Sequence, residues 1–182
     1  MKDSIKVADW AAAGLAAKSG AESEMKTHGR FSVECRDAEG NLRWAEASDN
    51  LVVTAGKNDM EAKYFSGSSY TAAFYVGLKG TGTALAADTM ASHASWSEIV
   101  PYSNSTRPAF TAGTPASGVV SNSGSVAVFN INATSTIYGC FITTNNTPSG
   151  TTGTLFAASD FSVNRSVLSG DILSVTYTLT LT

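Results

Sequence analysis

The chain has 182 residues, of which 43% are hydrophobic and 15% are charged, and its formal net charge at pH 7 is −3. The charged share is well below the ~25% of average globular domains, and no basic patch stands out, so we expect no direct nucleic-acid partner. No apolar stretch reaches the ~20 residues of a membrane-spanning helix, and the N-terminus lacks the pattern of a secretory signal. We therefore expect no membrane association and synthesis in a cytoplasm.

Charge is unevenly distributed along the chain. Residues 101–182 hold only four of its twelve basic and fifteen acidic side chains, namely Arg107, Asp160, Arg165 and Asp171. A solvated monomer usually carries more charge than this. The second half is therefore buried in sheets, exposed through Ser, Thr and Asn, or covered by partner subunits, and we take its composition as an indication of assembly.

The N-terminal residues 1–28 are predicted to form a helical arm and linker that precedes a β domain over residues 29–182. Alanine-rich residues 4–19 favour a short helix, and the polar stretch that follows is typical of a linker. The large apolar residues of the helix do not form a clean stripe, so the helix either packs on its own domain or reaches a neighbouring subunit. The candidate partner-contact residues are Ile5, Trp10 and Leu15.

Residues 30–53 predict a hairpin, because Phe31 to Cys35 alternates at period two and residues 37–41 have turn composition. Residues 54–66 predict a short helix. Asn58 followed by Glu61 resembles a capping box, and Gly67 suits its end. Cys35 and Cys140 are far apart in sequence, and we expect two buried free thiols.

The remainder of the chain predicts short strands separated by turns. The predicted strands cover residues 72–78, 96–100, 118–120, 125–131, 136–142 and 172–181, with two short apolar pieces, 155–156 and 161–163, on either side of a loop. The last strand alternates most clearly: its apolar residues are Leu173, Val175, Tyr177, Leu179 and Leu181. We expect a mainly β fold, a β-sandwich of jelly-roll-like type with a short N-terminal helix and one short internal helix.

A search for catalytic or metal-binding patterns gives weak candidates only. Asp88, His93 and Glu98 are spaced five apart, which matches neither a helix face nor a strand face and is not a zinc-ligand spacing. Ser95 or Ser97 with His93 and Asp88 has the residue types of a catalytic triad, but no Gly-x-Ser-x-Gly motif supports it. We therefore expect these residues to lie in a surface loop.

Other chemistry is disfavoured in the same way. Glycoside hydrolases use a pair of catalytic carboxylates. Asp160 and Asp171 are the only acidic residues of the second half, and the residues around each are typical of a turn, so we do not expect them to form such a pair. The glycine-rich residues 77–82 lack the order of a P-loop, and no calcium-binding loop is present. We predict no enzyme activity, no metal and no cofactor.

Four aromatic residues could form a sugar-binding platform instead. They are Tyr70, Tyr75, Trp96 and Tyr102. Because aromatic residues in strands are more often part of the core, we expect most of them to be buried.

Several segments resemble small structural proteins of tailed bacteriophages. The resemblance is carried by residues 50–58 (NLVVTAGKN), 96–98 (WSE) with Tyr102 and Arg107-Pro108, 136–141 (TIYGCF), 153–156 (GTLF) with Phe161, and 170–178 (GDILSVTYT). Together they span roughly residues 30–182. The resemblance implies a virion protein of the group that includes cement and decoration proteins with sandwich folds, and it implies no catalytic residue.

The functional hypothesis is capsid decoration. The protein would bind the outside of a phage capsid as a dimer or trimer, contact the major capsid protein, and clamp neighbouring capsid subunits after synthesis in the host cytoplasm. The alternative is a tail- or fibre-associated receptor-binding module. That alternative predicts solvent-facing aromatic residues clustered on one group of loops.

Overall fold

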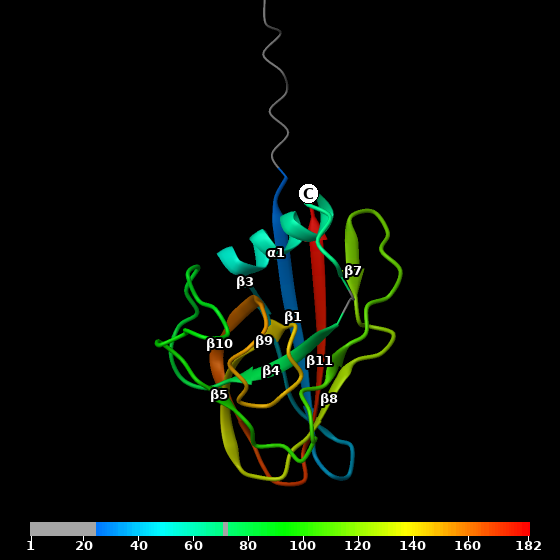
Figure 1. The fold of residues 1–182 in the computed structure, drawn as a ribbon. Coiled ribbons are helices and arrows are strands. Elements are labelled where there is room, and N and C mark those ends of the chain that lie inside the picture. Colours follow the sequence, from blue (N-terminus) through cyan, green and yellow to red (C-terminus); the bar gives the residue numbers. More distant parts are fainter. Residues whose placement is uncertain (1–24, 71–72) are drawn as a thin grey trace, which may run out of the picture.

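The computed structural model describes residues 25–70 and 73–182, and in it two antiparallel β-sheets pack face to face (Figure 1). The predicted N-terminal helix and the residues Ile5, Trp10 and Leu15 lie outside the described residues. The mainly β architecture with one internal helix confirms the predicted fold class. None of the helices in the described ranges has the length and apolarity needed to cross a membrane.

The first sheet is built around the last strand of the chain. Its order is β2 (Leu42–Asp49), β1 (Thr27–Arg36), β11 (Ile172–Leu181) and β7 (Val119–Ser121), and β8 (Ala127–Asn130) also pairs with β11. β1 and β11 pair along their whole length, from Thr27 opposite Leu181 to Arg36 opposite Ile172. The predicted alternation of β11 places Leu173, Val175 and Tyr177 in the core, whereas Leu181 is exposed.

The second sheet has the order β3 (Leu51–Val52), β10 (Leu155–Val167), β9 (Ser135–Thr143), β4 (Phe74–Lys79) and β5 (Glu98–Ile99), with β6 (Ala109–Phe110) also paired to β4. The prediction of two short pieces around residues 157–160 was wrong, because β10 is one strand. Ala157 and Ala158 are small and fully buried, and they continue the pairing with β9 up to a register shift that follows Asp160. A run of Ala, Ser and Asp has the composition of a loop, and tertiary packing overrides that local preference.

Helix α1 (Thr54–Tyr64) connects β3 to β4 and packs on β10. It begins four residues before the predicted capping box, with Val53 at the N-cap and no side-chain cap. The predicted start at residue 54 is confirmed, and the helix ends two residues before the predicted end at residue 66. Gly67 has a φ of +65°, and Ser68 N donates a hydrogen bond to Ala62 O at 3.3 Å, so the chain leaves the helix through a left-handed glycine.

The core has two parts. The larger cluster fills the space between the sheets and includes Phe31, Phe129 and Tyr177. The smaller cluster lies on the other face of the second sheet, where Trp96 and Met90 from the β4–β5 connection cover Phe141 and its neighbours. Both cysteines are buried and free, as predicted.

Candidate binding surfaces

Each of the four charged side chains in residues 101–182 forms an ion pair with a residue from the first half of the chain. The pairs are Arg107–Glu98 at 2.7 Å, Asp160–Lys79 at 2.7 Å, Arg165–Glu46 at 2.6 Å, and Asp171–Arg43. The scarce charges of the second half therefore hold its segments to the first half.

The Arg107–Glu98 pair fixes the loop that joins β9 to β10. The guanidinium binds the carboxylate with two hydrogen bonds, at 2.8 and 2.7 Å, and donates two more, to Asn145 O at 2.7 Å and Gly150 O at 3.1 Å. Ser149 N donates to the same carboxylate at 2.7 Å. The side chain of Arg107 is fully buried, so its charge is neutralised entirely inside the protein.

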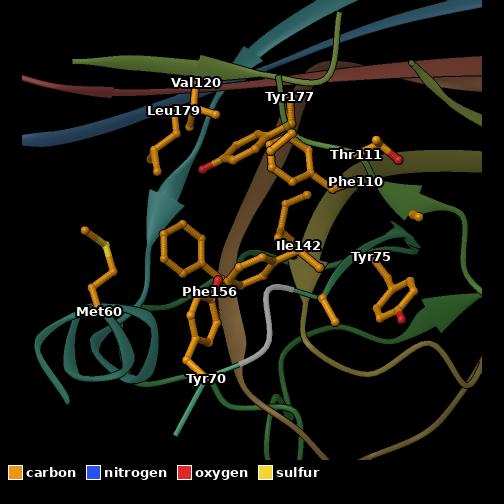
Figure 2. A pocket seen from close by; sticks show the side chains of 14 residues that line it. Met60, Tyr70, Tyr75, Phe110, Thr111, Val120, Ile142, Phe156, Tyr177 and Leu179 are labelled. Atoms are coloured by element: carbon orange, nitrogen blue, oxygen red, sulfur yellow. The ribbon is translucent and has the colours of Figure 1, made fainter. Parts of the chain in front are cut away.

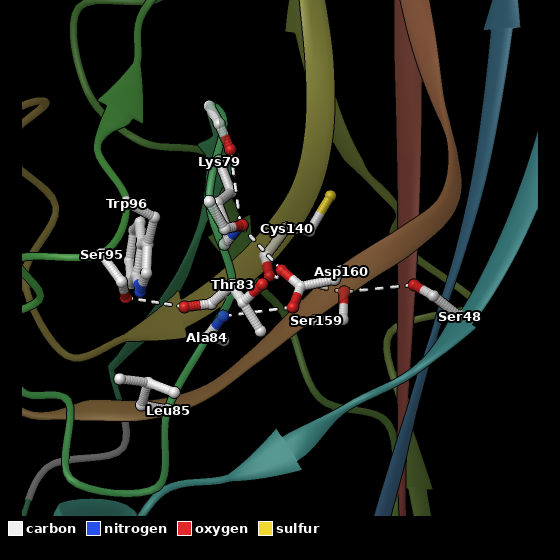
Figure 3. A network of polar contacts seen from close by, with 12 residues as sticks. Ser48, Lys79, Thr83, Ala84, Leu85, Ser95, Trp96, Cys140, Ser159 and Asp160 are labelled. Atoms are coloured by element: carbon white, nitrogen blue, oxygen red, sulfur yellow. Dashed lines mark hydrogen bonds and ion pairs between the residues drawn. The ribbon is translucent and has the colours of Figure 1, made fainter.

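The Lys79–Asp160 pair fixes the connection between β4 and β5 (Figure 3). Lys79 is fully buried, and its ammonium also donates to Gly82 O. Ala84 N donates to Asp160 Oδ2 at 3.1 Å. The ammonium lies 5.8 Å from the ring centroid of Trp96, which adds a cation–π contact. This network attaches the connection to the outer face of the second sheet.

The remaining two pairs join β2 to distant segments. Glu46 accepts hydrogen bonds from Arg165 Nη2 at 2.6 Å and from Ser162 Oγ at 2.9 Å. Burial raises the pKa of Glu46, but these hydrogen bonds and the positive charge outweigh it, so the net shift is downward. Asp171 pairs with Arg43 and also accepts from Leu168 N at 2.8 Å, which is the backbone contact expected of a turn aspartate.

These pairings leave a neutral surface, which we define as residues 111–126 and 144–154, neither of which contains Asp, Glu, Lys, Arg or His. Residues 111–118 are exposed throughout. Arg107 links the two segments. Its backbone N–H donates a hydrogen bond to Asn146 O in the second segment at 2.7 Å, and β6 leads from it to residue 111, where the first segment begins. The first segment contains β7 and the loops on either side of it (Figure 1).

A tight turn shapes part of the neutral surface. Ala116 and Val119 exchange two backbone hydrogen bonds of 2.9 Å around Ser117 and Gly118, which have φ values of 51° and 76°. Two consecutive positive φ values define the two-residue hairpin turn that matches strand twist. The hydrogen bonds of this turn therefore fix the backbone of residues 116–119 before any partner binds.

An apolar pocket of about 600 Å³ opens between the two sheets beside α1 (Figure 2). Phe156 and Ile142 come from the second sheet, Tyr177 and Leu179 from the first, and Met60 from the helix. The described residues that line it are Met60, Tyr70, Ala73, Phe74, Tyr75, Ala109, Phe110, Thr111, Ala112, Val120, Ile142, Phe156, Tyr177 and Leu179. None of these residues carries a charge, so the pocket suits an apolar group.

Exposed aromatic residues lie at and after the C-terminal end of α1. Tyr64 is 83% exposed, Phe65 74% and Tyr70 50%. The rings of Tyr64 and Phe65 meet edge to face at 4.9 Å, and Tyr70 lies 6.5 Å from Phe74 in the pocket wall. We call these three residues the aromatic rim.

The residues singled out for metal or catalytic chemistry have structural roles. His93 stacks on Trp96 at 4.1 Å, and its Nδ1 lies 2.9 Å from Trp96 O. Asp88 accepts hydrogen bonds from Leu85 N and Trp96 Nε1, both at 2.8 Å. Ser95 Oγ donates to Thr83 O at 2.7 Å. Across residues 25–70 and 73–182, no three His, Cys, Asp or Glu residues are grouped as metal ligands.

The aromatic candidates are divided between core and surface. Trp96 and Tyr102 are buried, Tyr75 is half-buried, and Tyr70 belongs to the aromatic rim. Tyr64 and Phe65 were not among the aromatic residues predicted for a platform. Met60 lines the pocket, whereas Tyr64, about one helical turn later in α1, faces solvent.

Comparison with protein-family models, with curated proteins and with solved structures finds no match. The neutral surface, the apolar pocket, the aromatic rim and the resemblance of the sequence segments are therefore the observations that bear on function.

Proposed function

We propose that this chain is a structural protein of a bacteriophage virion that binds the outside of the capsid and stabilises the shell by clamping neighbouring capsid subunits. Its partner is the major capsid protein, and the neutral surface is the contact. We infer the class of protein from the resemblance of the sequence segments to tailed-phage structural proteins. We infer how the protein binds the capsid from the neutral surface.

The observation that carries the proposal is the internal use of every charged side chain in residues 101–182. Charged residues are depleted at the centres of protein interfaces, because their water shells must be removed on binding. A surface of Ser, Thr, Asn, Gly and Pro can lose water at little electrostatic cost and still form hydrogen bonds. The preformed turn at Ser117 and Gly118 also reduces the entropy lost on binding.

The test is binding of the purified protein to phage heads that lack it. The double substitution Thr114→Lys with Ser125→Lys places two charges on the neutral surface at exposed positions. The matched control, Ser32→Lys with Ala45→Lys, adds the same charge to the exposed face of β1 and β2, next to Glu34. We expect the first variant to lose at least about tenfold in affinity, since each unpaired buried charge costs more than 1.4 kcal/mol, and the control to bind normally.

Bound protein should also raise the temperature at which heads lose their DNA or break apart. Equal binding by both variants would exclude the neutral surface as the contact. Failure of the intact protein to bind heads at all would overturn capsid decoration.

A tail- or fibre-associated receptor-binding module is the second candidate. The aromatic rim favours it, because Tyr64, Phe65 and Tyr70 are solvent-facing aromatic residues clustered at one end of the sandwich. Saturable binding to host cells, abolished by Tyr64→Ser with Phe65→Ser and absent for heads, would support this candidate against decoration.

A further inference from the structure

We infer that the apolar pocket beside α1 receives an aromatic side chain of the protein that covers the neutral surface, and that this side chain anchors the contact. This role rests on the proposed function, because it names the feature of the capsid protein that the surface recognises. Three features of the pocket carry it: the place where the pocket opens, the exposed apolar side chains of its wall, and the rings of its floor.

The pocket opens onto the neutral surface. Thr111, Ala112 and Val120 line the pocket and also belong to residues 111–126, which are the first segment of that surface. Thr111 and Ala112 are exposed, so they form a lip that the two sites share. A partner that covers residues 111–126 therefore also covers this side of the opening.

The wall of the pocket leaves large apolar side chains partly in water. Phe74, Phe110 and Leu179 pack against the main core cluster, yet each is only half-buried. Exposed apolar side chains that lie next to one another mark sites of interaction, because their removal from water is favourable. The wall is thus the part of this end of the sandwich that gains most from being covered.

The floor of the pocket favours an aromatic occupant. Ile142, Phe156 and Tyr177 are buried and form this floor between the sheets (Figure 2). The ring of Phe156 meets that of Phe74, and the ring of Tyr177 meets that of Phe110, both edge to face with centroids 5.7 Å apart. A further ring inserted among these four adds ring pairs of the same favourable kind.

The lining also excludes a charged anchor. None of the described residues that line the pocket carries a charge. An arginine or lysine side chain would therefore lose its water without gaining a carboxylate partner, which is unfavourable. The volume of about 600 Å³ lies within the ~300–1,000 Å³ that is usual for binding pockets, so it has room for a large ring and the atoms next to it.

Backbone pairing holds the lip in place in the free protein. Gly113 N donates a hydrogen bond to Ser121 O at 2.8 Å, and Val120 pairs with Leu179 of β11. These contacts fix the chain on either side of Ala112 relative to the first sheet. An occupant that enters a preformed pocket loses less free energy to ordering.

The pocket supplies what the neutral surface lacks. At protein interfaces, a few large side chains in pockets provide most of the binding energy, and near-neutral contacts around them exclude water. The small polar residues of the neutral surface suit the second role, but they offer no cavity for an anchor. The pocket at its edge suits the first role.

The first experiment uses the full chain and N-phenyl-1-naphthylamine, an uncharged aromatic probe whose fluorescence rises in apolar surroundings. We expect the free protein to bind the probe, and phage heads that lack the protein to displace it, with heads alone as the background. Thr114→Lys with Ser125→Lys changes no residue of the lining, so this variant should bind the probe normally and, because it does not bind heads, keep it. No binding of the probe to the free protein, or probe that stays on protein captured by heads, would overturn the inference.

The second experiment blocks the opening. Ala112→Trp places an indole on the exposed lip, and Ala45→Trp, at an exposed position of β2 outside the lining, is the matched control. We expect the first variant to lose probe binding and at least about tenfold in affinity for heads, and the control to keep both. Circular dichroism and thermal unfolding check that both variants fold.

The outcomes separate the pocket from the capsid proposal. Normal binding of heads by folded Ala112→Trp protein would overturn the anchor and leave capsid decoration standing. Failure of the intact protein to bind heads would overturn both.

Discussion

The guanidinium of Arg107 and the carboxylate of Glu98 form a two-point ion pair, with Nε–Oε1 and Nη2–Oε2 distances of 2.8 and 2.7 Å. The Arg107 side chain is fully buried and that of Glu98 is 6% exposed. Because each charged group is removed from water, its charge is stabilised by its partner in the pair. The pair also organises the β9–β10 loop, which forms part of the neutral surface.

Removal of one member of this pair should destabilise the protein strongly. We expect Arg107→Met to lower the free energy of unfolding by about 3–5 kcal/mol, because Glu98 is left as a buried, unpaired charge. Urea-induced unfolding measures the change. The control is Arg30→Met, which breaks the exposed Arg30–Asp49 pair and should cost less than about 1 kcal/mol. Equal effects of the two substitutions would contradict the structural role of Arg107.

Glu46 should make stability sensitive to acid. Its pKa in the folded protein is lowered from the ordinary value of 4.5. A carboxylate with a lowered folded-state pKa stabilises the protein fully above its unfolded-state pKa, and this contribution is lost as pH falls through the folded-state value. Unfolding free energies measured from pH 7 downward should therefore start to decline near pH 4.5. Glu46→Gln should flatten part of this decline, and an unchanged slope in that variant would contradict the role of Glu46.

Both thiols should be unreactive in the folded protein. Burial, followed by the nearby carboxylate of Asp171, raises the pKa of Cys35 to about 12, and burial also raises the pKa of Cys140. The thiolate is the nucleophile, so little of it is present at pH 8. An aromatic disulfide reagent should label neither cysteine within minutes in buffer and both in denaturant. Rapid labelling of the native protein would show that one of the thiols is accessible.

Gly139 should tolerate no side chain. A Cβ at this position in β9 would overlap the backbone carbonyl oxygen of Ser159 in β10, and backbone atoms cannot move aside as a flexible side chain can. We expect Gly139→Ala to cost at least about 1–3 kcal/mol through overpacking. Gly124→Ala is the matched control, because nothing lies within 4 Å of its Cβ position. Thermal unfolding should separate the two, and similar melting temperatures would show that the sheet adjusts.

The sequence predicted the strands whose burial alternates, and it did less well where burial is continuous. β11 and the β1–β2 hairpin follow period two, because one face of each is in the core and the other is solvated. In β10, small residues are buried on both faces, and such a run has no periodic signal. The start of helix α1 at Thr54 was predicted, but the capping box at Asn58 and Glu61 was wrong, because the N-cap is Val53, which provides no capping side chain.

The candidate surfaces could be predicted only in part. The scarcity of charge in residues 101–182 is visible in the sequence, and it pointed to a covered surface. The pairing of those charges is not visible, because partners such as Glu46 and Arg165 lie far apart along the chain. The pocket depends on residues from six strands and one helix, and no local pattern connects them. Glu98, from the grouping of Asp88, His93 and Glu98 that the sequence disfavoured as a metal site, binds Arg107, and no local pattern reveals that partner.

The pairing of β1 with β11 sets the order in which the protein can be assembled during translation. β1 and β2 leave the ribosome early and can form a hairpin, but the other edge of β1 has no partner until β11 is made. β7 and β8 also pair with β11. Because these long-range contacts form last, the first sheet closes only after residues 172–181 have been made. Until then the newly made chain carries an open strand edge, which exposes it to association with other chains in the crowded cell.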